Sequence, residues 1–195
     1  MNCNGVSCVI LALVVLAAGA AHGQTAGSEI NFSATREGEF IFAEARVDLA
    51  AAPALAWAVL TDYEAYPRFI STMRESKVMS RGPAGTVVEQ KGSFGFLFFS
   101  QEIEARMLVA EFPPNSIVAR SVGGSFRELL GRYELLPVGA GVRLSYTGRL
   151  VPEFGLPPLI GMSIVHYALK KNFTEMVDEI RRRDALARQP FKAAQ

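Results

Sequence analysis

Cysteine and histidine are almost absent from this chain, which has two of each in 195 residues. Cys3, Cys8 and His22 all lie close to the N-terminus, so His166 is the only one of these residues in the rest of the sequence. Structural disulfides, cysteine nucleophiles and multi-histidine zinc sites are therefore excluded from the body of the protein. We expect no bound metal.

An excess of charge of either sign is also missing. The chain carries 20 Lys and Arg against 19 Asp and Glu, a formal net charge of +1, whereas nucleic-acid-binding proteins usually present a strongly basic face. Arg132 and Arg143 alternate with apolar neighbours, which places them on the solvated face of strands. No glycine-flanked nucleophile is present either. We expect no nucleic-acid partner and no cofactor, and we assign no catalytic residue.

The N-terminus has the pattern of a signal peptide. An apolar run from Val9 to Ala18 is followed by small residues up to Gly23, which is typical of a hydrophobic region and its cleavage zone. The run is shorter than the roughly 20 residues that a membrane-spanning helix needs. We predict a signal peptide over residues 1–23 and an exported protein, periplasmic or secreted. A retained membrane anchor is the alternative.

The remainder reads as one domain over residues 36–187, between a flexible lead-in (24–35) and a loose C-terminal tail (188–195). Alternating apolar and charged residues, clearest from Glu102 to Val109, predict an antiparallel sheet with one buried and one wet face. Further strands are expected near residues 39–49, 87–89, 117–122, 129–135 and 142–147. The first has imperfect alternation at Ala43–Ala45, where a bulge is possible, and a hairpin tip is expected at Gly92–Gly95.

Helical patterns flank these strands. Pro53 fits the first turn of a helix, and Pro67 disfavours helical geometry at Tyr66, so we expect two short helices joined near residues 61–66. Apolar residues recur at three- and four-residue spacings from Met162 to Ile180, which predicts a long amphipathic helix. Such a helix is stable only when it packs, and the sheet is its one available partner.

The stretch from Thr61 to Ile70 contains Asp62, Tyr63, Tyr66 and Pro67. Together with the element order, it resembles the START-like (SRPBCC) superfamily over residues 36–187, and most closely its polyketide cyclase/dehydrase and coenzyme-Q-binding branch. The resemblance implies an α+β helix-grip fold. In this fold a curved antiparallel sheet wraps around a long C-terminal helix, and two short helices follow the first strand. An apolar cavity between sheet and helix would hold a hydrophobic small molecule.

Candidate ligand-binding residues follow from that expected fold and from the apolar faces of the predicted elements. The candidates for the cavity wall are Trp57, Met107, Tyr133, Tyr146, Met162, His166, Leu169 and Phe173. Two apolar patches supply candidates for a cavity mouth, namely Phe94, Phe96 and Phe98 in one and Phe154, Leu156 and Ile160 in the other. These patches either form a gate that touches a membrane or are covered by loops as part of the core. His166 is either a packed core side chain or a polar anchor that faces the ligand.

Three functions fit these features. The first is binding of a lipid or isoprenoid quinone by a monomer, with transfer of the ligand during a transient contact with a membrane. The second is a cyclase- or aromatase-like enzyme that uses His166 and cavity tyrosines; the lack of a second histidine and the predicted export argue against it. The third is an interaction module whose cavity is closed. Whether any reaction is catalysed stays open at this point.

Overall fold

A computed structural model describes residues 29–96 and 99–189 of the chain. Within these residues, eight strands and two α-helices follow one another, with a short 3₁₀ helix after the first α-helix. Their bounds are β1 (Asn31–Glu37), β2 (Phe40–Leu49), α1 (Pro53–Leu60), the 3₁₀ helix (Tyr63–Arg68), β3 (Met73–Gly82), β4 (Gly85–Phe96), β5 (Phe99–Phe112), β6 (Ser116–Gly124), β7 (Phe126–Val138), β8 (Gly141–Pro152) and α2 (Gly161–Arg188).

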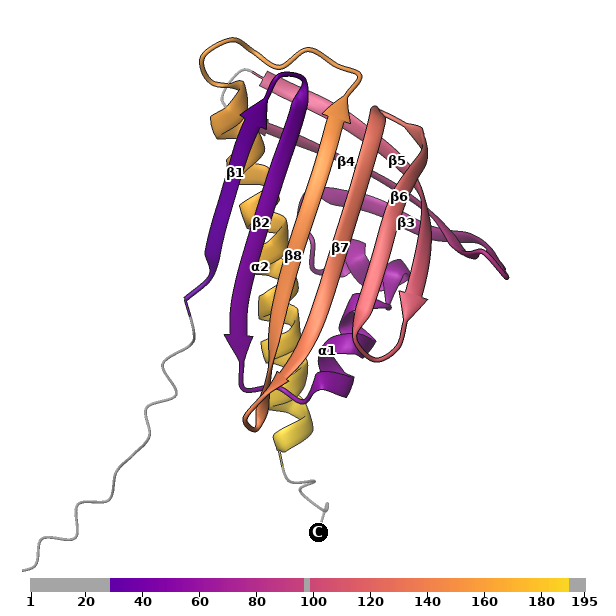
Figure 1. Ribbon diagram of the computed structural model, residues 1–195, viewed down its shortest axis with the longest axis vertical. Coiled ribbons are helices and arrows are strands. Elements are labelled where there is room, and N and C mark those ends of the chain that lie inside the picture. Colours follow the sequence, from indigo (N-terminus) through magenta and orange to yellow (C-terminus); the bar gives the residue numbers. More distant parts are fainter. Residues whose placement is uncertain (1–28, 97–98, 190–195) are drawn as a thin grey trace, which may run out of the picture.

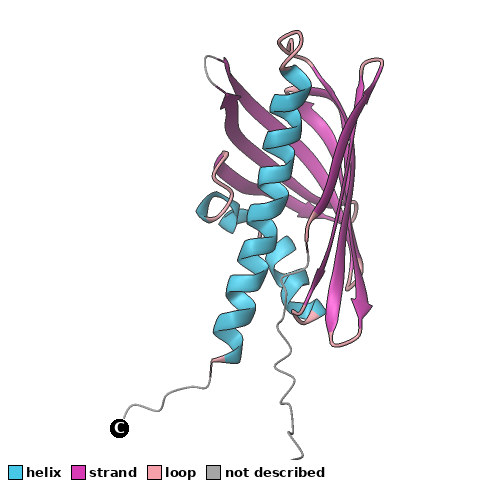
Figure 2. Cartoon of the chain, turned by 90° about the vertical axis from the view of Figure 1, so that its left-hand side faces the viewer, coloured by secondary structure: helices cyan, strands magenta, loops and turns pink. Residues whose placement is uncertain are grey.

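All eight strands form one antiparallel sheet in the order β1-β2-β8-β7-β6-β5-β4-β3. Strands β3 to β8 follow each other as a meander, and the β1–β2 hairpin joins the sheet beside β8 (Figure 1). The sheet curves, and α2 lies along its concave side (Figure 2). This arrangement confirms the predicted helix-grip fold.

Helix α2 packs through an apolar stripe, as its residue spacing predicts. Val177 and Ile180 have no solvent exposure, and Phe173 and Met176 are 3% exposed. The helix contacts β1 and β2 at one edge of the sheet and β4 near the other, so its apolar side closes the space inside the curve. No helix in the described part of the chain is long and apolar enough to cross a membrane.

The first turn of α2 is more deeply covered than the sequence indicates. Residue spacing puts Ile164 on the side opposite the apolar stripe, yet its side chain is only 3% exposed. The preceding loop covers this turn, because a Cβ atom at Gly161 would meet Leu156 Cβ at 2.8 Å. The loop therefore packs against the first turn of α2, where Gly161 and Ile164 are both buried.

The segment that resembles START-like proteins links α1 to β3. Helix α1 begins at Pro53, as expected, and ends at Leu60. Pro67 does not interrupt the next helix but lies inside the 3₁₀ turn, which ends one residue later at Arg68. The predicted pair of short helices is confirmed, but it follows the second strand rather than the first, and Pro67 marks the end of the second helix rather than the junction between them.

Side-chain bonds attach this segment to α2 and to α1. The Tyr66 hydroxyl donates to the Leu60 carbonyl oxygen over 2.6 Å. The backbone N–H and the hydroxyl of Ser71 donate to the Glu175 carboxylate over 2.9 and 2.6 Å. The Thr72 hydroxyl bonds Asn172 Oδ1 at 2.7 Å. The segment is therefore held against the side of α2 where β3 begins.

Strand β2 contains no bulge. It pairs in continuous register with β1 and β8, and Ile41, Ala43, Ala45, Val47 and Leu49 are all buried. The buried positions alternate regularly, but two of them are alanines, and the larger Phe40 and Phe42 lie on the opposite face. The predicted bulge is wrong. Two of the inward-facing residues are small alanines, so the positions of the large apolar side chains do not identify the buried face of β2.

Two other boundaries differ from the sequence prediction. The lead-in expected over residues 24–35 becomes strand β1 at Asn31, where seven residues pair with β2. The expected hairpin tip at Gly92–Gly95 lies inside β4, which runs to Phe96. Gly92 serves a different purpose, since a Cβ atom there would lie 2.2 Å from the Thr72 carbonyl oxygen. The glycine admits a close backbone crossing rather than a turn.

Candidate functional site: an apolar cavity between sheet and helix

A cavity of about 290 Å³ lies between the concave face of the sheet and α2. Its lining comes from β2 to β8, from the α1–β3 segment and from α2, and includes members of both apolar core clusters. Natural ligand pockets have volumes of roughly 300–1,000 Å³, so this space suits one small molecule. Most of the lining side chains are apolar.

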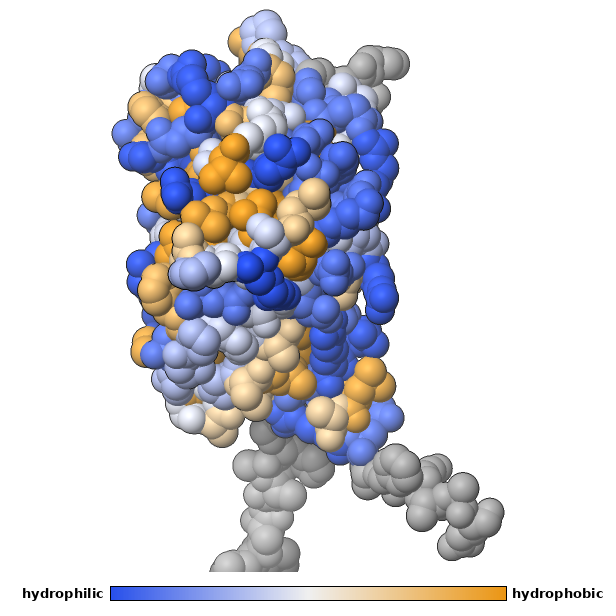
Figure 3. All heavy atoms as spheres, turned by 90° about the vertical axis from the view of Figure 1, so that its right-hand side faces the viewer, coloured by the Kyte–Doolittle hydropathy of each residue, from blue (hydrophilic) through white to orange (hydrophobic). Residues whose placement is uncertain are grey.

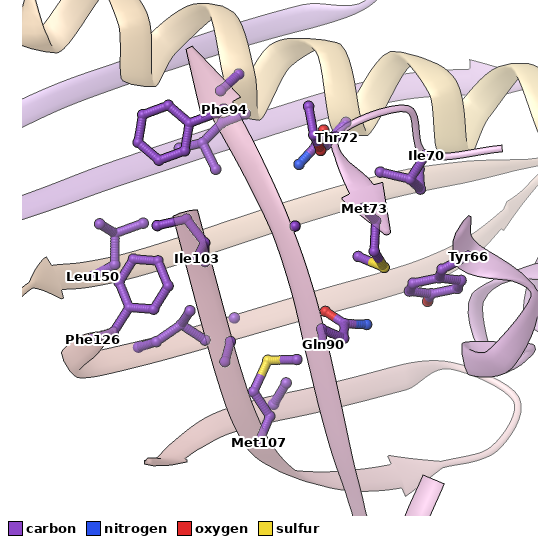
Figure 4. Close-up of a pocket in the computed structure, with 18 of the residues that line it drawn as sticks. Tyr66, Ile70, Thr72, Met73, Gln90, Phe94, Ile103, Met107, Phe126 and Leu150 are labelled. Atoms are coloured by element: carbon purple, nitrogen blue, oxygen red, sulfur yellow. The ribbon is translucent and has the colours of Figure 1, made fainter. Parts of the chain in front are cut away.

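Five of the eight cavity candidates named from the sequence line this space. They are Met107, Tyr133, Tyr146, Leu169 and Phe173. They come from four elements, β5, β7, β8 and α2, which are far apart in the sequence. Figure 4 shows Met107 projecting from β5 toward the interior of the cavity, which Phe126 and Leu150 also line.

Trp57, Met162 and His166 do not line the cavity. Trp57 is half-buried on α1 and packs against the main core cluster. The His166 ring makes an edge-on contact with Phe32 of β1, with ring centroids 4.9 Å apart. The side of α2 that carries Met162 and His166 therefore turns toward the β1 edge of the sheet, and only part of the apolar stripe faces the cavity. Of the two alternatives for His166, the structure has the packed side chain, and His166 is not among the residues that line the cavity.

The two apolar patches meet at one end of the molecule. Phe94 and Phe154 have ring centroids 5.9 Å apart, and Phe154 lies 6.0 Å from Phe126. Phe94, Phe154 and Leu156 line the cavity and are only half-buried, so the cavity approaches the surface beside them. We call these three residues the mouth. Phe98 lies outside the described residues, as does the side chain of Phe96, and Ile160 is 46% exposed without lining the cavity.

Small residues lie in register across the middle of the sheet. Ala43, Gly148, Gly131 and Ala119 lie opposite one another on four consecutive strands, β2, β8, β7 and β6. Of these, Gly131 and Ala119 line the cavity. None of these four residues was among the site residues predicted from the sequence. The signal for this row was present as glycine or alanine in the middle of otherwise well-formed strands, which often marks a close approach.

Four tyrosines line the cavity, and two of them have hydrogen-bond partners in the protein. The Tyr63 hydroxyl donates to Glu111 Oε1 over 2.8 Å, and the Tyr66 hydroxyl is bound to the Leu60 carbonyl as described above. Burial raises the pKa of Tyr63, and the bond to Glu111 raises it further. Burial likewise raises the pKa of Tyr66. Both phenols remain protonated and serve to fix the α1–β3 segment.

Charged groups contribute little to the cavity wall. Lys91 is half-buried in the lining, and its ammonium pairs with Glu89 Oε1 at 3.1 Å. Among the described residues, no group of three or more His, Cys, Asp or Glu could hold a metal ion. The arrangement can enclose an apolar molecule and offer it a few neutral hydrogen bonds, but it provides no evident acid–base pair.

Comparison with solved structures gives the same fold. A START superfamily protein from Mycobacterium smegmatis matches with a TM-score of 0.62 at 15% identity, over 72% of this chain and 97% of that one. The Zhui aromatase/cyclase from a Streptomyces species matches at 0.59 and 17% identity, over 74% and 95%. A STAR-related lipid transfer protein from Xanthomonas axonopodis matches at 0.57 and 14%, over 77% and 98%.

At these identities the structural matches establish the fold alone. No curated protein matches the sequence significantly. The model of one sequence family, described as polyketide cyclase / dehydrase and lipid transport, matches residues 49–165. This match covers more than half of the chain, from the end of β2 to the first turns of α2. The chain therefore belongs to the polyketide cyclase / dehydrase and lipid transport family and has a START-like fold.

Proposed function

We propose that the protein binds one apolar small molecule, a lipid or an isoprenoid quinone, in the cavity between the sheet and α2. The observation that carries this proposal is a largely apolar cavity whose wall reaches half-buried aromatic residues at one end. Transfer of apolar surface out of water gains roughly 25 cal/mol per Å². A ligand that is enclosed on most sides would therefore bind without any charged contact.

A fluorescence titration tests this proposal. N-phenyl-1-naphthylamine, an apolar dye that brightens when it leaves water, should bind the wild-type protein at one site. Ala168 is 9% exposed on α2 and lines the cavity, so Ala168→Phe should fill the space and weaken binding at least tenfold. Ala185→Phe is the matched control, because Ala185 is exposed on the same helix. Equal binding by both variants would refute the proposed site.

We also propose that the protein exchanges its ligand at a membrane surface near the mouth. Leu159 is fully exposed, and Ile160 and Tyr167 are 46% and 54% exposed, all near the start of α2. Leu159 also has a backbone φ of 69°, a conformation that disfavours branched or bulky side chains. The exposed Leu159 side chain buries no apolar surface when the chain folds, whereas contact with a bilayer would bury it.

A further apolar area on another face is not part of this membrane-exchange proposal. The side where β3 to β6 lie in Figure 1 carries hydrophobic surface near its middle, surrounded by hydrophilic residues (Figure 3). In this part of the sheet, the side chains of Phe112 and Val122 are 59% and 47% exposed. They belong to β5 and β6, whereas the residues that we assign to membrane contact adjoin the mouth through Leu156.

Vesicle transfer separates membrane contact from ligand binding. A double variant, Leu159→Asp with Ile160→Asp, should slow transfer of a fluorescent ligand between phosphatidylcholine vesicles and leave its equilibrium affinity unchanged. Leu186→Asp is the control, since Leu186 is 53% exposed near the opposite end of α2. Normal transfer by the double variant would show that the exposed residues at the start of α2 have no part in exchange.

Export completes the proposal and rests on the N-terminal sequence, which lies outside the described residues. The apolar run and the small residues that follow it support cleavage of a signal peptide. N-terminal sequencing of the mature protein should find a start near His22 or Gln24. A membrane-embedded protein that starts at Met1 would contradict export.

An enzymatic function has less support. The match to an aromatase/cyclase concerns the fold, and the only histidine in the described residues packs against Phe32 outside the cavity lining. Without this histidine, the cavity lining offers a reaction only its tyrosines, Lys91 and a few uncharged polar side chains. We therefore retain ligand binding as the proposed function.

A further inference from the structure

Tyr133 and Tyr146 form a pair inside the cavity that packing alone does not explain. They lie directly opposite each other on β7 and β8, with ring centroids 4.8 Å apart and planes inclined by 43°. Both line the cavity. Each is half-buried, and because each lines the cavity, part of its accessible surface faces the cavity.

Their hydroxyl groups differ from those of the other two cavity tyrosines. Tyr63 and Tyr66 each donate to a protein oxygen, whereas neither Tyr133 nor Tyr146 donates to any described residue. Neither hydroxyl oxygen is among the fully buried atoms that lack a partner, so each stays accessible from the cavity, where an acceptor on a ligand would satisfy it. Two donors that no described residue uses, on tyrosines directly opposite each other in the sheet, therefore point to a partner that is not part of the chain.

The backbone is shaped to hold Tyr146 in this position. A Cβ atom at Gly148 would lie 2.5 Å from the Tyr146 hydroxyl oxygen, and one at Gly131 would lie 3.4 Å from the same oxygen. The Tyr146 side chain therefore lies over two glycines that face each other on β7 and β8. Any larger residue at Gly148 would displace the phenol, so the sheet fixes the position of this donor before a ligand arrives.

The protonation state makes both groups hydrogen-bond donors. Burial raises the pKa of Tyr146 to about 12, and burial together with the neighbouring Tyr146 raises the pKa of Tyr133 well above its ordinary value. The preferred partner is therefore an acceptor oxygen. A neutral acceptor fits better than a carboxylate, because the surrounding wall is apolar and an unpaired buried charge is costly.

The pair also lies far from the mouth. Phe126, which contacts Phe154 of the mouth, pairs with Pro152 at the start of β7. Tyr133 follows Phe126 by seven residues, and at about 3.3 Å per residue the two are separated by roughly 20 Å along the strand. A ligand that reaches the tyrosines would place its polar end deep in the cavity and its apolar remainder toward the mouth.

We propose that Tyr133 and Tyr146 form a two-donor clamp that binds a neutral carbonyl oxygen on an otherwise apolar ligand, which enters the cavity with its carbonyl end first. This inference rests on the proposed ligand-binding function and adds the chemical class of the ligand. Of the two classes in that proposal, the clamp favours a quinone or ketone over a simple hydrocarbon chain or a free carboxylate.

Two ligands of similar shape test the clamp, namely 2-methyl-1,4-naphthoquinone and 2-methylnaphthalene. Wild-type protein should bind the quinone more tightly. The double variant Tyr133→Phe with Tyr146→Phe keeps both rings and should lower quinone affinity about tenfold or more, while hydrocarbon affinity stays within twofold. Tyr167→Phe is the control, because Tyr167 is 54% exposed and does not line the cavity, and it should leave the preference for the quinone unchanged. Decanoate should bind more weakly than 2-decanone.

Infrared spectroscopy gives a second readout that a purely structural role would not change. The carbonyl stretch of the bound quinone should shift to lower frequency in wild-type protein and return toward its value in apolar solvent in the double variant. If both ligands bind but the double variant weakens neither or weakens both equally, the clamp is refuted while the binding function stands. If neither ligand binds wild-type protein, both proposals fail.

Discussion

We expect the ionised Glu179 carboxylate to stabilise the folded protein, and we expect this stabilisation to be lost at acidic pH. Its side chain is 6% exposed on α2 and accepts bonds from Arg182 over 2.6 and 2.8 Å and from Arg183 over 2.7 Å. Arg183 also pairs with Asp62 at 2.9 Å, so the carboxylate anchors an arginine that reaches the α1–β3 segment. The bond from Arg182 is the largest cause that lowers the pKa of Glu179, to about 2 from 4.5.

The lowered pKa of Glu179 translates into stability. A tenfold change in proton affinity corresponds to about 1.4 kcal/mol, so the ion pairs could contribute up to about 3 kcal/mol. Solvent screens part of this, since the Arg182 side chain is 60% exposed. We expect Glu179→Gln to lower the free energy of unfolding by about 1–3 kcal/mol near pH 7. A group whose folded pKa is depressed contributes fully above its unfolded pKa, here 4.5, and the contribution is lost as pH falls toward 2.

Urea denaturation followed by tryptophan fluorescence measures this directly, because Trp57 is the only tryptophan of the chain. The difference between wild type and Glu179→Gln should be constant at neutral pH and shrink steadily below about pH 4.5. Asp178→Asn is the control, because that neighbouring side chain is 59% exposed, and it should change stability by less than about 0.5 kcal/mol. A Glu179→Gln variant as stable as wild type at pH 7, or a difference that persists undiminished at low pH, would refute this reasoning.

Two further predictions concern the cavity wall. Ile180→Ala should lower the free energy of unfolding by about 2–5 kcal/mol, because Ile180 is fully buried and does not line the cavity. Phe173→Ala should lower it by less than the roughly 3–5 kcal/mol usual for phenylalanine, because one side of Phe173 already faces the cavity. Urea denaturation that finds the reverse order would contradict a cavity at Phe173. Gly148→Ala should displace the Tyr146 ring and weaken quinone binding. Gly155→Ala is the control, because a Cβ atom at Gly155 would meet no other atom within 4 Å. Equal quinone affinities of the two variants in a titration would show that Gly148 does not position the Tyr146 phenol.

The sequence predicts the fold well because its main signals are periodic. The two-residue alternation in β5, β7 and β8 and the three- and four-residue spacing in α2 each identify a buried face without reference to other elements. The same local signal fails in β2, where Ala43 and Ala45 face the interior and larger phenylalanines face outward. Which face is buried there depends on α2, and the local sequence does not contain that information.

The candidate site is less predictable for the same reason. Tyr133 and Phe173 line the cavity as expected, because each lies on the plainly apolar face of its own element. His166 shares the apolar stripe of α2 but packs on Phe32, since the rotation of the helix against the sheet decides which part of the stripe meets the cavity. The role of Gly131 and Gly148 depends on cross-strand register with Tyr146, which only the assembled sheet reveals.

Methionine methyl groups offer the most direct test of ligand binding in the cavity. Met73, Met107 and Met176 line it, whereas Met79, which is 54% exposed, and Met162 do not. In protein labelled with ¹³C at the methionine methyls, saturation with 2-methyl-1,4-naphthoquinone should shift the resonances of the first three and give them nuclear Overhauser contacts to the ligand. The resonances of Met79 and Met162 should stay in place. Unchanged resonances for Met107 and Met176 at saturating ligand, or contacts confined to Met79, would contradict binding in this cavity.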